Sequence, residues 1–258
     1  MESTFFVITD IHGCDTALKE LLRHREKGQT LVFLGDAIDR GDDNSGVLKR
    51  MLFLRKALAD KFIYLRGNHE QMFLDAIYYA EKEDVDLFLQ NGGNETMYDL
   101  WMTHEYLARD FPTFKALMFD KNKPGTFWHM NFSEYAQLLE DTSFFYQTGK
   151  LLFTHAGFQS FYEDWTMTSE NQYMWTRGHY QHENRSGLLN VFGHTPTSLI
   201  VEDNEQGDIY NNIENGYLGL DGGGVFGGQH HAVVLSSEGE LLKQYSYVDK
   251  TGALTEVK

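Results

Sequence analysis

Residues 4–13 read TFFVITDIHG, a run of apolar, aromatic and β-branched residues that stops abruptly at Asp10. A continuous apolar run of this length is typical of a strand that is buried on both faces. The same pattern, a short apolar run that ends at polar groups, recurs in four further segments: residues 31–34, 62–65, 151–154 and 188–192. These runs predict the central strands of the fold.

Helical periodicity fills the gaps between the first three runs. Leu18, Leu21 and Leu22 fall on one helical face. A second apolar face follows Asn44-Ser45, a typical helix start signal. Strands that alternate with helices at this spacing are typical of βαβ units and a parallel sheet. The sequence therefore predicts an α/β protein.

The C-terminal part of the chain has a different pattern. Residues 217–220, 232–235 and 245–248 resemble strands joined by Gly-rich or Glu-Gly turns, with no helical pattern between them. Such segments are typical of antiparallel pairing. The polar tail, residues 249–258, predicts a frayed end.

Residues 71–148 are rich in aromatic and acidic residues and show helical spacing, for example at Met72, Phe73 and Ile77. No Pro/Ser/Gly-rich linker isolates this stretch, so we expect a helical cap packed on the core rather than an independent domain. The whole chain, residues 1–258, is then a single domain. Aromatic residues of the cap would either stack on a nucleobase or, as we favour, form the core of the cap itself.

The composition limits the function classes. The 258 residues include 22 Lys+Arg and 38 Asp+Glu, for a formal net charge of −16. This charge argues against sequence-independent nucleic-acid binding, which relies on Lys and Arg at the phosphate backbone. It also opposes small anionic substrates unless positive charge gathers locally.

The same composition bears on location. One cysteine cannot form an intramolecular disulfide, which favours a reducing, cytoplasmic compartment. Residues 1–10 lack the basic and apolar regions of a signal peptide. No run of about 18 apolar residues is present, so we expect no membrane partner.

Polar residues with metal-ligating side chains end the predicted strands. They are Asp10, His12, Asp36, Asn68, His155 and His194. Ligands of α/β sheets bind beyond the carboxyl ends of the strands, so these side chains would converge. Nitrogen and oxygen donors without sulfur suit Mn, Fe or Zn better than Ca or Mg. With one bridging carboxylate, six ligands would hold two ions. The alternative for any one of them is an ordinary turn or capping residue.

Five ordered sequence blocks carry a family resemblance. They are residues 9–13 (TDIHG), 35–41 (GDAIDRG), 67–70 (GNHE), 155–157 (HAG) and 193–195 (GHT). Together they resemble the phosphoprotein phosphatase family of metallophosphoesterases, and particularly its small bacterial and phage branch. The only departure in the blocks is Thr9, where the family has glycine. The resemblance implies a calcineurin-like fold with two mixed β-sheets in a central sandwich flanked by helices.

The resemblance also implies the metal ligands. Asp10, His12 and Asp36 would hold one divalent ion. The second ion would be held by Asp36, Asn68, His155 and His194, so that Asp36 bridges. We expect manganese, with iron or zinc as alternatives, and direct attack by a water or hydroxide shared between the ions.

Further roles follow from the same resemblance. Arg40, Arg66 and Arg177 would bind the phosphoryl oxygens. His69 would protonate the leaving alkoxide, and Asp39 would hold His69 and keep it protonated. No phosphoenzyme is expected.

Two short patterns elsewhere carry little weight. Cys14 is followed by Glu20 where a C-x5-R phosphatase requires arginine, so it is no nucleophile of that type. Residues 222–227 match G-x-G-x-x-G, but no helical pattern follows, so we expect a close-packed loop near the active site rather than a dinucleotide fingerprint. His230, close to this loop, is either a substrate contact or a packing residue.

These observations favour a metal-dependent phosphatase that hydrolyses phosphoserine or phosphothreonine in proteins. A dinucleoside polyphosphate hydrolase of the same fold, acting for example on diadenosine tetraphosphate, is the first alternative. A catalytically degenerate protein that binds metal or phosphopeptide is the third, although His69, Asp39 and the arginines would then have no role. The sequence leaves the oligomeric state open, with a monomer as the default.

Overall fold

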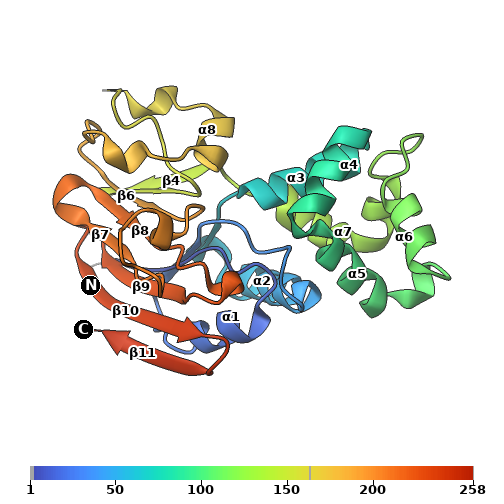
Figure 1. Cartoon of the computed structure of the whole chain (residues 1–258), viewed down its shortest axis with the longest axis horizontal. Helices are drawn as coiled ribbons and strands as arrows, with labels where there is room; N and C mark the ends of the chain where they lie inside the picture. The colour runs from blue at the N-terminus through green and yellow to red at the C-terminus, as the bar shows by residue number, and fades with distance from the viewer. Residues whose placement is uncertain (1–2, 163, 258) are drawn as a thin grey trace.

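The computed structural model describes residues 3–162 and 164–257, so residues 1–2, 163 and 258 of the predicted domain lie outside the described residues. The first sheet has six strands in the order β11-β10-β9-β1-β2-β3 (Figure 1). Strand β1 (Thr4–Ile8) is parallel to β2 (Thr30–Phe33), and β2 is parallel to β3 (Phe62–Tyr64). The predicted parallel arrangement of the first three strands is confirmed.

The C-terminal strands extend this sheet in antiparallel fashion. Strand β9 (His230–Ser236) pairs with β1, β10 (Leu241–Val248) with β9, and β11 (Ala253–Val257) with β10. The frayed tail predicted for residues 249–258 is therefore wrong over 253–257. Ladder hydrogen bonds join backbone groups, so a polar segment can serve as an edge strand.

The second sheet has five strands in the order β4-β5-β6-β8-β7. Strand β4 (Phe145–Thr148) is antiparallel to β5 (Leu151–Thr154), and β5 is parallel to β6 (Leu189–Phe192). Strand β8 (Tyr217–Gly219) is parallel to β6 and antiparallel to β7 (Tyr210–Asn212). The antiparallel pairing predicted for residues 217–220 is therefore confirmed on the β7 side only, and β8 belongs to a different sheet from β9 and β10. That prediction relied on the absence of a helical pattern, but the crossover from β6 to its parallel neighbour β8 is made without an α-helix, through short 3-10 turns and β7.

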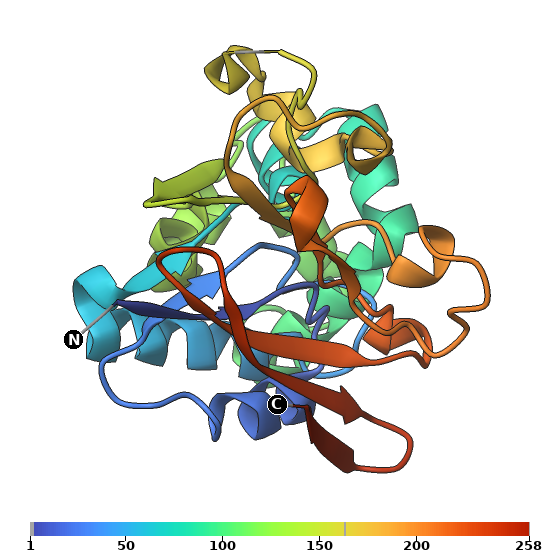
Figure 2. The same cartoon turned by 90° about the vertical axis from the view of Figure 1, so that its left-hand side faces the viewer.

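The two sheets pack face to face and enclose one buried apolar cluster (Figure 2). Its members come from strands of both sheets: Phe5, Val7, Val32, Leu34, Leu65, Leu151, Phe153, Leu189, Val191, Leu218, Leu220, Val233 and Leu235. Because side chains alternate along a strand, Phe6 and Ile8 of β1 point to the opposite face, where the helices lie. The predicted sandwich of two mixed sheets is confirmed.

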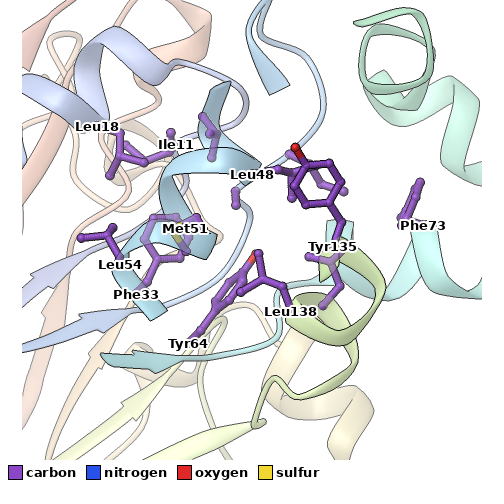
Figure 3. Close-up of a cluster of buried hydrophobic side chains, with 14 of the residues drawn as sticks. Ile11, Leu18, Phe33, Leu48, Met51, Leu54, Tyr64, Phe73, Tyr135 and Leu138 are labelled. Carbon is purple, nitrogen blue, oxygen red and sulfur yellow. The ribbon is translucent and has the colours of Figure 1, made fainter. Parts of the chain in front are cut away.

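Helices α1 (Asp15–Leu22) and α2 (Asn44–Leu58) cover the outer face of the first sheet. Figure 3 shows their contact with the sheet, where Leu18 of α1 and Met51 of α2 belong to the same buried cluster as Phe33 of β2. Burial of this apolar face, rather than helix propensity, is what stabilises such helices.

The insertion between β3 and β4 is helical. Its helices are α3 (Asn68–Tyr78), α4 (Lys82–Phe88), α5 (Asn94–Thr103), α6 (Phe111–Met118) and α7 (Thr126–Glu140). They gather at the right of Figure 1, away from the strands. The fully buried Phe114 and Trp128 belong to the same cluster as the residues beneath α1 and α2. We therefore retain, as a proposal, a single domain with a helical cap at about residues 71–148. The last four residues of that predicted range, 145–148, are not helical but form strand β4 of the second sheet.

The remaining helix, α8 (Glu170–Trp175), follows β5. No helix in residues 3–162 or 164–257 combines the length and apolar character needed to cross a bilayer.

Candidate metal centre

The loops that follow five strands of the two sheets converge on one buried site. Six side chains meet there: Asp10, His12, Asp36, Asn68, His155 and His194, each of them buried. Asp10, His12, Asp36 and His194 have positive φ angles of 46°, 45°, 57° and 65°. Non-glycine residues rarely adopt this conformation, and strained backbone of this kind gathers at functional sites.

Two groups of potential ligands share Asp36. The first group is His12, Asp36 and His69, and the second is Asp36, His155 and His194; within each group the ligand atoms lie within 4.8 Å of one another. Oδ2 of Asp36 lies 3.5 Å from Nε2 of His12, and Oδ1 lies 3.4 Å from Nε2 of His155. Each carboxylate oxygen therefore faces a different group, which is the arrangement that a bridging ligand requires.

Backbone carbonyls orient two of these histidines. Nδ1 of His12 donates to the carbonyl oxygen of Ile38 at 2.9 Å, and Nδ1 of His155 donates to that of Leu34 at 3.0 Å. Each Nε2 atom therefore keeps a lone pair. That of His155 faces Asn68, and that of His12 accepts from the Arg40 guanidinium at 2.5 Å.

The donor set fits a cation. Nε2 of His155 lies 3.0 Å from Oδ1 of Asn68, so two acceptor atoms face each other. Among the described residues, Nε2 of His194 is buried without a hydrogen-bond partner. Converging lone pairs of this kind are stabilised by a divalent ion.

Burial also sets the charge of the imidazoles. It lowers the pKa of His155 to about 3 and, assisted by repulsion from other cationic groups, lowers the pKa values of His12 and His194. Neutral imidazole is the form that binds metals. Burial and the neighbouring Asp10 carboxylate raise the pKa of Asp36, and a bound cation would favour its ionised form.

Asp10 lies beside these two groups rather than within them. Its carboxylate accepts hydrogen bonds from the backbone N–H of His194, at 3.1 and 3.2 Å, and from the hydroxyl of Thr9. Thr9, the departure from the family pattern, therefore contacts the Asp10 carboxylate directly. A Cβ at Gly193 would lie 2.1 Å from Oδ2 of Asp10, so only glycine permits this approach between β1 and β6.

Glu70 is a site residue to which the sequence analysis assigned no role. Its fully buried carboxylate accepts from the backbone N–H groups of Asp36, Ala37 and Gly67 and from the hydroxyl of Tyr64, at 2.7 to 2.9 Å. It thereby ties the loop after β2 to the start of α3. The signal was present in the GNHE block, but its function becomes evident only from these contacts.

The structure brings His69 and Asp39 together as predicted, with Nδ1 of His69 2.7 Å from Oδ2 of Asp39. Their predicted charge state is not supported. Burial, with a contribution from Arg40, lowers the pKa of His69 to about 3, and burial raises the pKa of Asp39. Burial therefore favours the uncharged pair, in which the proton of the shared hydrogen bond resides on Asp39. Nε2 of His69 carries a proton in this form as in the ion pair.

Two of the three predicted arginines border a cavity of about 310 Å³ beside the site. Arg40 and Arg177 line it together with His12, His194 and Asp10. The Arg177 guanidinium donates to the hydroxyl of Thr195 at 3.1 Å.

Arg66 is placed elsewhere. Its guanidinium donates to the Thr142 hydroxyl at 2.8 Å and to the carbonyl oxygen of Glu140 at 2.8 Å, at the end of α7. It also donates to the Gln71 side chain and lies 5.3 Å from the centre of the Phe144 ring. The structure therefore does not bring Arg66 to the cavity.

The Gly-rich loop forms one wall of the cavity, as predicted, and no helix follows it. Asp221, Gly223, Gly224 and Phe226 line the cavity. The Phe226 ring is 67% exposed, and the Arg40 guanidinium lies 5.1 Å from its centre.

The structure decides between the two alternatives for His230 in favour of a packing residue, and it adds Asp221 to the cavity wall. His230 is buried and its Nε2 lies 3.1 Å from Asp249, so it supports the loop and does not line the cavity. No role was predicted for Asp221. Burial, and after it the nearby Asp221 carboxylate, raise the pKa of Asp10.

The chain is similar to known phosphoesterases. The sequence model of the calcineurin-like phosphoesterase family matches residues 3–232. Serine/threonine-protein phosphatase 1 of Salmonella typhimurium is 40% identical over 92 residues, which cover 34% of this chain and 38% of that protein. The symmetrical bis(5'-nucleosyl)-tetraphosphatase of Acidovorax ebreus is 31% identical over 112 residues, which cover 40% of this chain and 38% of that protein. Both matches thus span well under half of the relatives' length.

Among solved structures, the cold-active protein-tyrosine phosphatase of a psychrophilic Shewanella superposes with a TM-score of 0.58 at 16% identity. The match covers 100% of this chain and 81% of that one. A likeness at this identity shows a shared fold.

Proposed function

The chain belongs to the calcineurin-like phosphoesterase family, and from this premise we propose that it is a metal-dependent phosphatase acting on phosphoserine and phosphothreonine in proteins. Family membership makes it a hydrolase of the metallophosphoesterase type that uses divalent metal ions. The observation that carries the proposal is the pair of ligand groups sharing Asp36, next to a cavity that two arginines border.

The proposed ligands are those that meet at the strand ends. His12, Asp36 and the nearby Asp10 would hold one ion; Asp36, Asn68, His155 and His194 would hold the other. When bound, two divalent ions would make a water acidic enough to act as a nucleophile at neutral pH and would withdraw charge from the phosphoryl group. We propose manganese, and iron or zinc would suit the same nitrogen and oxygen donors.

The arginines would bind the substrate. Arg40 and Arg177 reach the cavity from opposite sheets, and a guanidinium offers two directed donors to phosphoryl oxygens. Thr195 orients Arg177 through its hydroxyl. Arg66 would have to leave its contacts with the end of α7 to reach the same phosphate.

His69 and Asp39 would assist the leaving group. Nε2 of His69 is buried, faces the site and is 3.9 Å from Oδ2 of Asp36. Asp39 fixes the imidazole through Nδ1 at 2.7 Å. As the bond between phosphorus and the leaving oxygen breaks, the Nε2 proton would move to that oxygen, so that a neutral alcohol departs.

A dinucleoside polyphosphate hydrolase is the second candidate, and one observation favours it. Phe226 and Leu199, 67% and 73% exposed, line the cavity beside Arg40. An exposed aromatic ring next to a phosphate-binding arginine is suited to stacking on a nucleobase. The similarity to a tetraphosphatase points the same way.

A side-by-side assay separates the two candidates. kcat/KM is measured for a phosphoserine peptide and for diadenosine tetraphosphate with Mn²⁺ present, for the wild type and for Phe226→Leu. Our proposal expects the peptide to be the better substrate. Preference for the nucleotide by about a hundredfold or more, lost in Phe226→Leu, would establish the second candidate.

The proposed acid is tested separately. His69→Asn should lower kcat for the peptide by about 10²- to 10⁴-fold with bound metal retained. Full Mn-dependent hydrolysis by this variant would exclude the proposed role of His69, and complete inactivity of the wild type with Mn, Fe or Zn would favour the degenerate binding protein.

A further inference from the structure

The helical insertion reaches into the site through helix α5. Thr96 of this helix is fully buried, and its hydroxyl donates to Oδ1 of Asp39 at 2.5 Å. The same hydroxyl oxygen accepts from the backbone N–H of Asp39 at 3.0 Å. Thr96 thus contacts both the side chain and the backbone of one residue, 57 positions away in the sequence.

The two oxygens of Asp39 have separate partners. Oδ1 accepts from Thr96 and Oδ2 lies 2.7 Å from Nδ1 of His69. With a bond to His69 alone, the carboxylate would rotate about its terminal torsion, which is broad for Asp. The second bond fixes the plane of the carboxylate and, through Oδ2, the direction in which the imidazole points.

The backbone around Asp39 needs this support. Asp39 and Arg40 have φ angles of 76° and 68°, in the left-handed region that non-glycine residues seldom occupy. The side chain of Asn44 accepts from the Asp39 N–H at 2.7 Å, which adds a bond from α2.

The insertion contacts the next residue as well. The backbone N–H of Arg40 donates to the carbonyl oxygen of Gly92 at 3.1 Å. Gly92 has a φ of 102°, and a Cβ there would lie 2.6 to 2.7 Å from atoms of Arg40. The chain before α5 is therefore packed directly against the turn that carries Asp39 and Arg40.

We propose that Thr96 is a positioning residue for the His69–Asp39 pair, through which the helical insertion controls proton delivery to the leaving group. The proposal rests on the role given to His69 above. As the P–O bond breaks, its electron pair remains on the leaving oxygen and the Nε2 proton of His69 moves there, while water supplies the new oxygen on phosphorus. Proton transfer depends on the alignment of donor and acceptor, so loss of the Thr96 bond affects this step before it affects binding.

Leaving-group dependence provides the test, because a good leaving group needs little protonation. Thr96→Val keeps the shape of the side chain and removes the hydroxyl. We expect kcat for phenyl phosphate to fall about 10- to 100-fold, and kcat for p-nitrophenyl phosphate to fall less than about threefold, with KM and bound metal unchanged. Thr96→Ser should restore the phenyl phosphate rate, since it restores the donor.

The matched control is Thr103→Val in the same helix. The Thr103 hydroxyl bonds to Ser45 at 2.9 Å and to backbone carbonyls of α5, and has no bond to Asp39. The kcat values of the Thr103→Val variant should equal those of the wild type for both esters. If Thr96→Val does not fold, as judged by circular dichroism, Thr96→Cys offers a smaller side chain whose thiol is only a weak donor, and it should show the same selective loss.

The outcomes are distinct. Equal losses on both esters in Thr96→Val or Thr96→Cys, or no rescue by Thr96→Ser, would overturn the positioning role. His69→Asn is assayed in parallel. Absence of any leaving-group dependence in that variant would refute the proposed acid itself, whereas selectivity in His69→Asn without selectivity in the Thr96 variants refutes only the present inference.

Discussion

The β-sandwich and the helical insertion contribute to the site in different ways. The sandwich supplies five of the six proposed metal ligands from the ends of its strands, the sixth being Asn68 at the start of α3, and the backbone carbonyls of Ile38 and Leu34 orient His12 and His155. The insertion supplies no ligand from α4 to α7, yet Thr96 contacts Asp39 and the end of α7 holds Arg66. The positions of the proposed ligands therefore depend on local strand geometry, whereas the groups around them depend on packing between distant segments.

The largest expected loss of activity follows substitution of Asp36, the residue that both proposed ligand groups share. Asp36→Asn removes the charge that both ligand groups share, so it should lower activity at least about 10³-fold, more than the 10- to 100-fold that loss of an outer-shell partner typically causes. Bound metal, measured by mass spectrometry after desalting, should fall for both ions together. The exposed Asp42→Asn is the control. Loss of only one ion would show that Asp36 does not bridge.

Substitution of Arg40 and of Arg66 compares an arginine that lines the cavity with one that contacts the helical insertion. Arg40→Ala should lower kcat/KM by about 10²-fold, because a charge-assisted contact to phosphate is lost. Arg66→Ala should lower it less than about fivefold and instead destabilise the protein, since its bonds to the end of α7 are lost. Activity assays and urea unfolding on both variants measure this. An Arg66 effect on activity equal to that of Arg40 would place Arg66 at the phosphate after all.

Glu70 joins the two regions, and its effect should appear in stability. Glu70→Gln replaces an acceptor of four hydrogen bonds by a side chain that brings its own donors, which should lower the free energy of unfolding by about 1–3 kcal/mol. Tyr64→Phe, which removes one of the four donors, should cost about 1 kcal/mol. Urea unfolding of the apoprotein compares them. Equal stability of Glu70→Gln and the wild type would contradict the role of Glu70 as the tie between β2 and α3.

The smallest expected effect concerns the surface of both regions. The chain has a net charge of −16, whereas Arg40 and Arg177 bring positive charge to the cavity. The phosphoserine would bind at the cavity and its flanking residues would face the acidic surface around it, so basic or neutral flanking residues should be preferred. We expect a few-fold advantage in kcat/KM for a basic-flanked peptide at low salt, decreasing toward physiological ionic strength. Equal values for acidic- and basic-flanked peptides at low salt would refute the preference.

Much of the fold was predictable because buried strands and their polar ends are local patterns. The runs before Asp10, Asp36 and His155 identified β1, β2 and β5 within a residue or two. Strand β7 (YNN) escaped prediction because it is polar and is stabilised by backbone pairing with β8. Strand β11 (ALTEV) escaped because its mixed residues show no regular alternation, and backbone pairing with β10 stabilises it. The parallel pairing of β8 with β6 was not predicted for a related reason: the segment that connects the two strands contains no α-helix, so the sequence shows no βαβ pattern there.

The candidate site divides along the same line. The sequence by itself determined which donor types end the strands, and its short blocks carried the resemblance that implies a divalent metal site, because these properties reside in short segments. Only the tertiary structure decided that Asp36 faces both ligand groups, that Arg66 contacts the end of α7, that burial favours the uncharged forms of His69 and Asp39, and that Thr96 contacts Asp39. The reason is physical: desolvation and side-chain hydrogen bonds depend on which segments pack together, and that packing is a property of the whole chain.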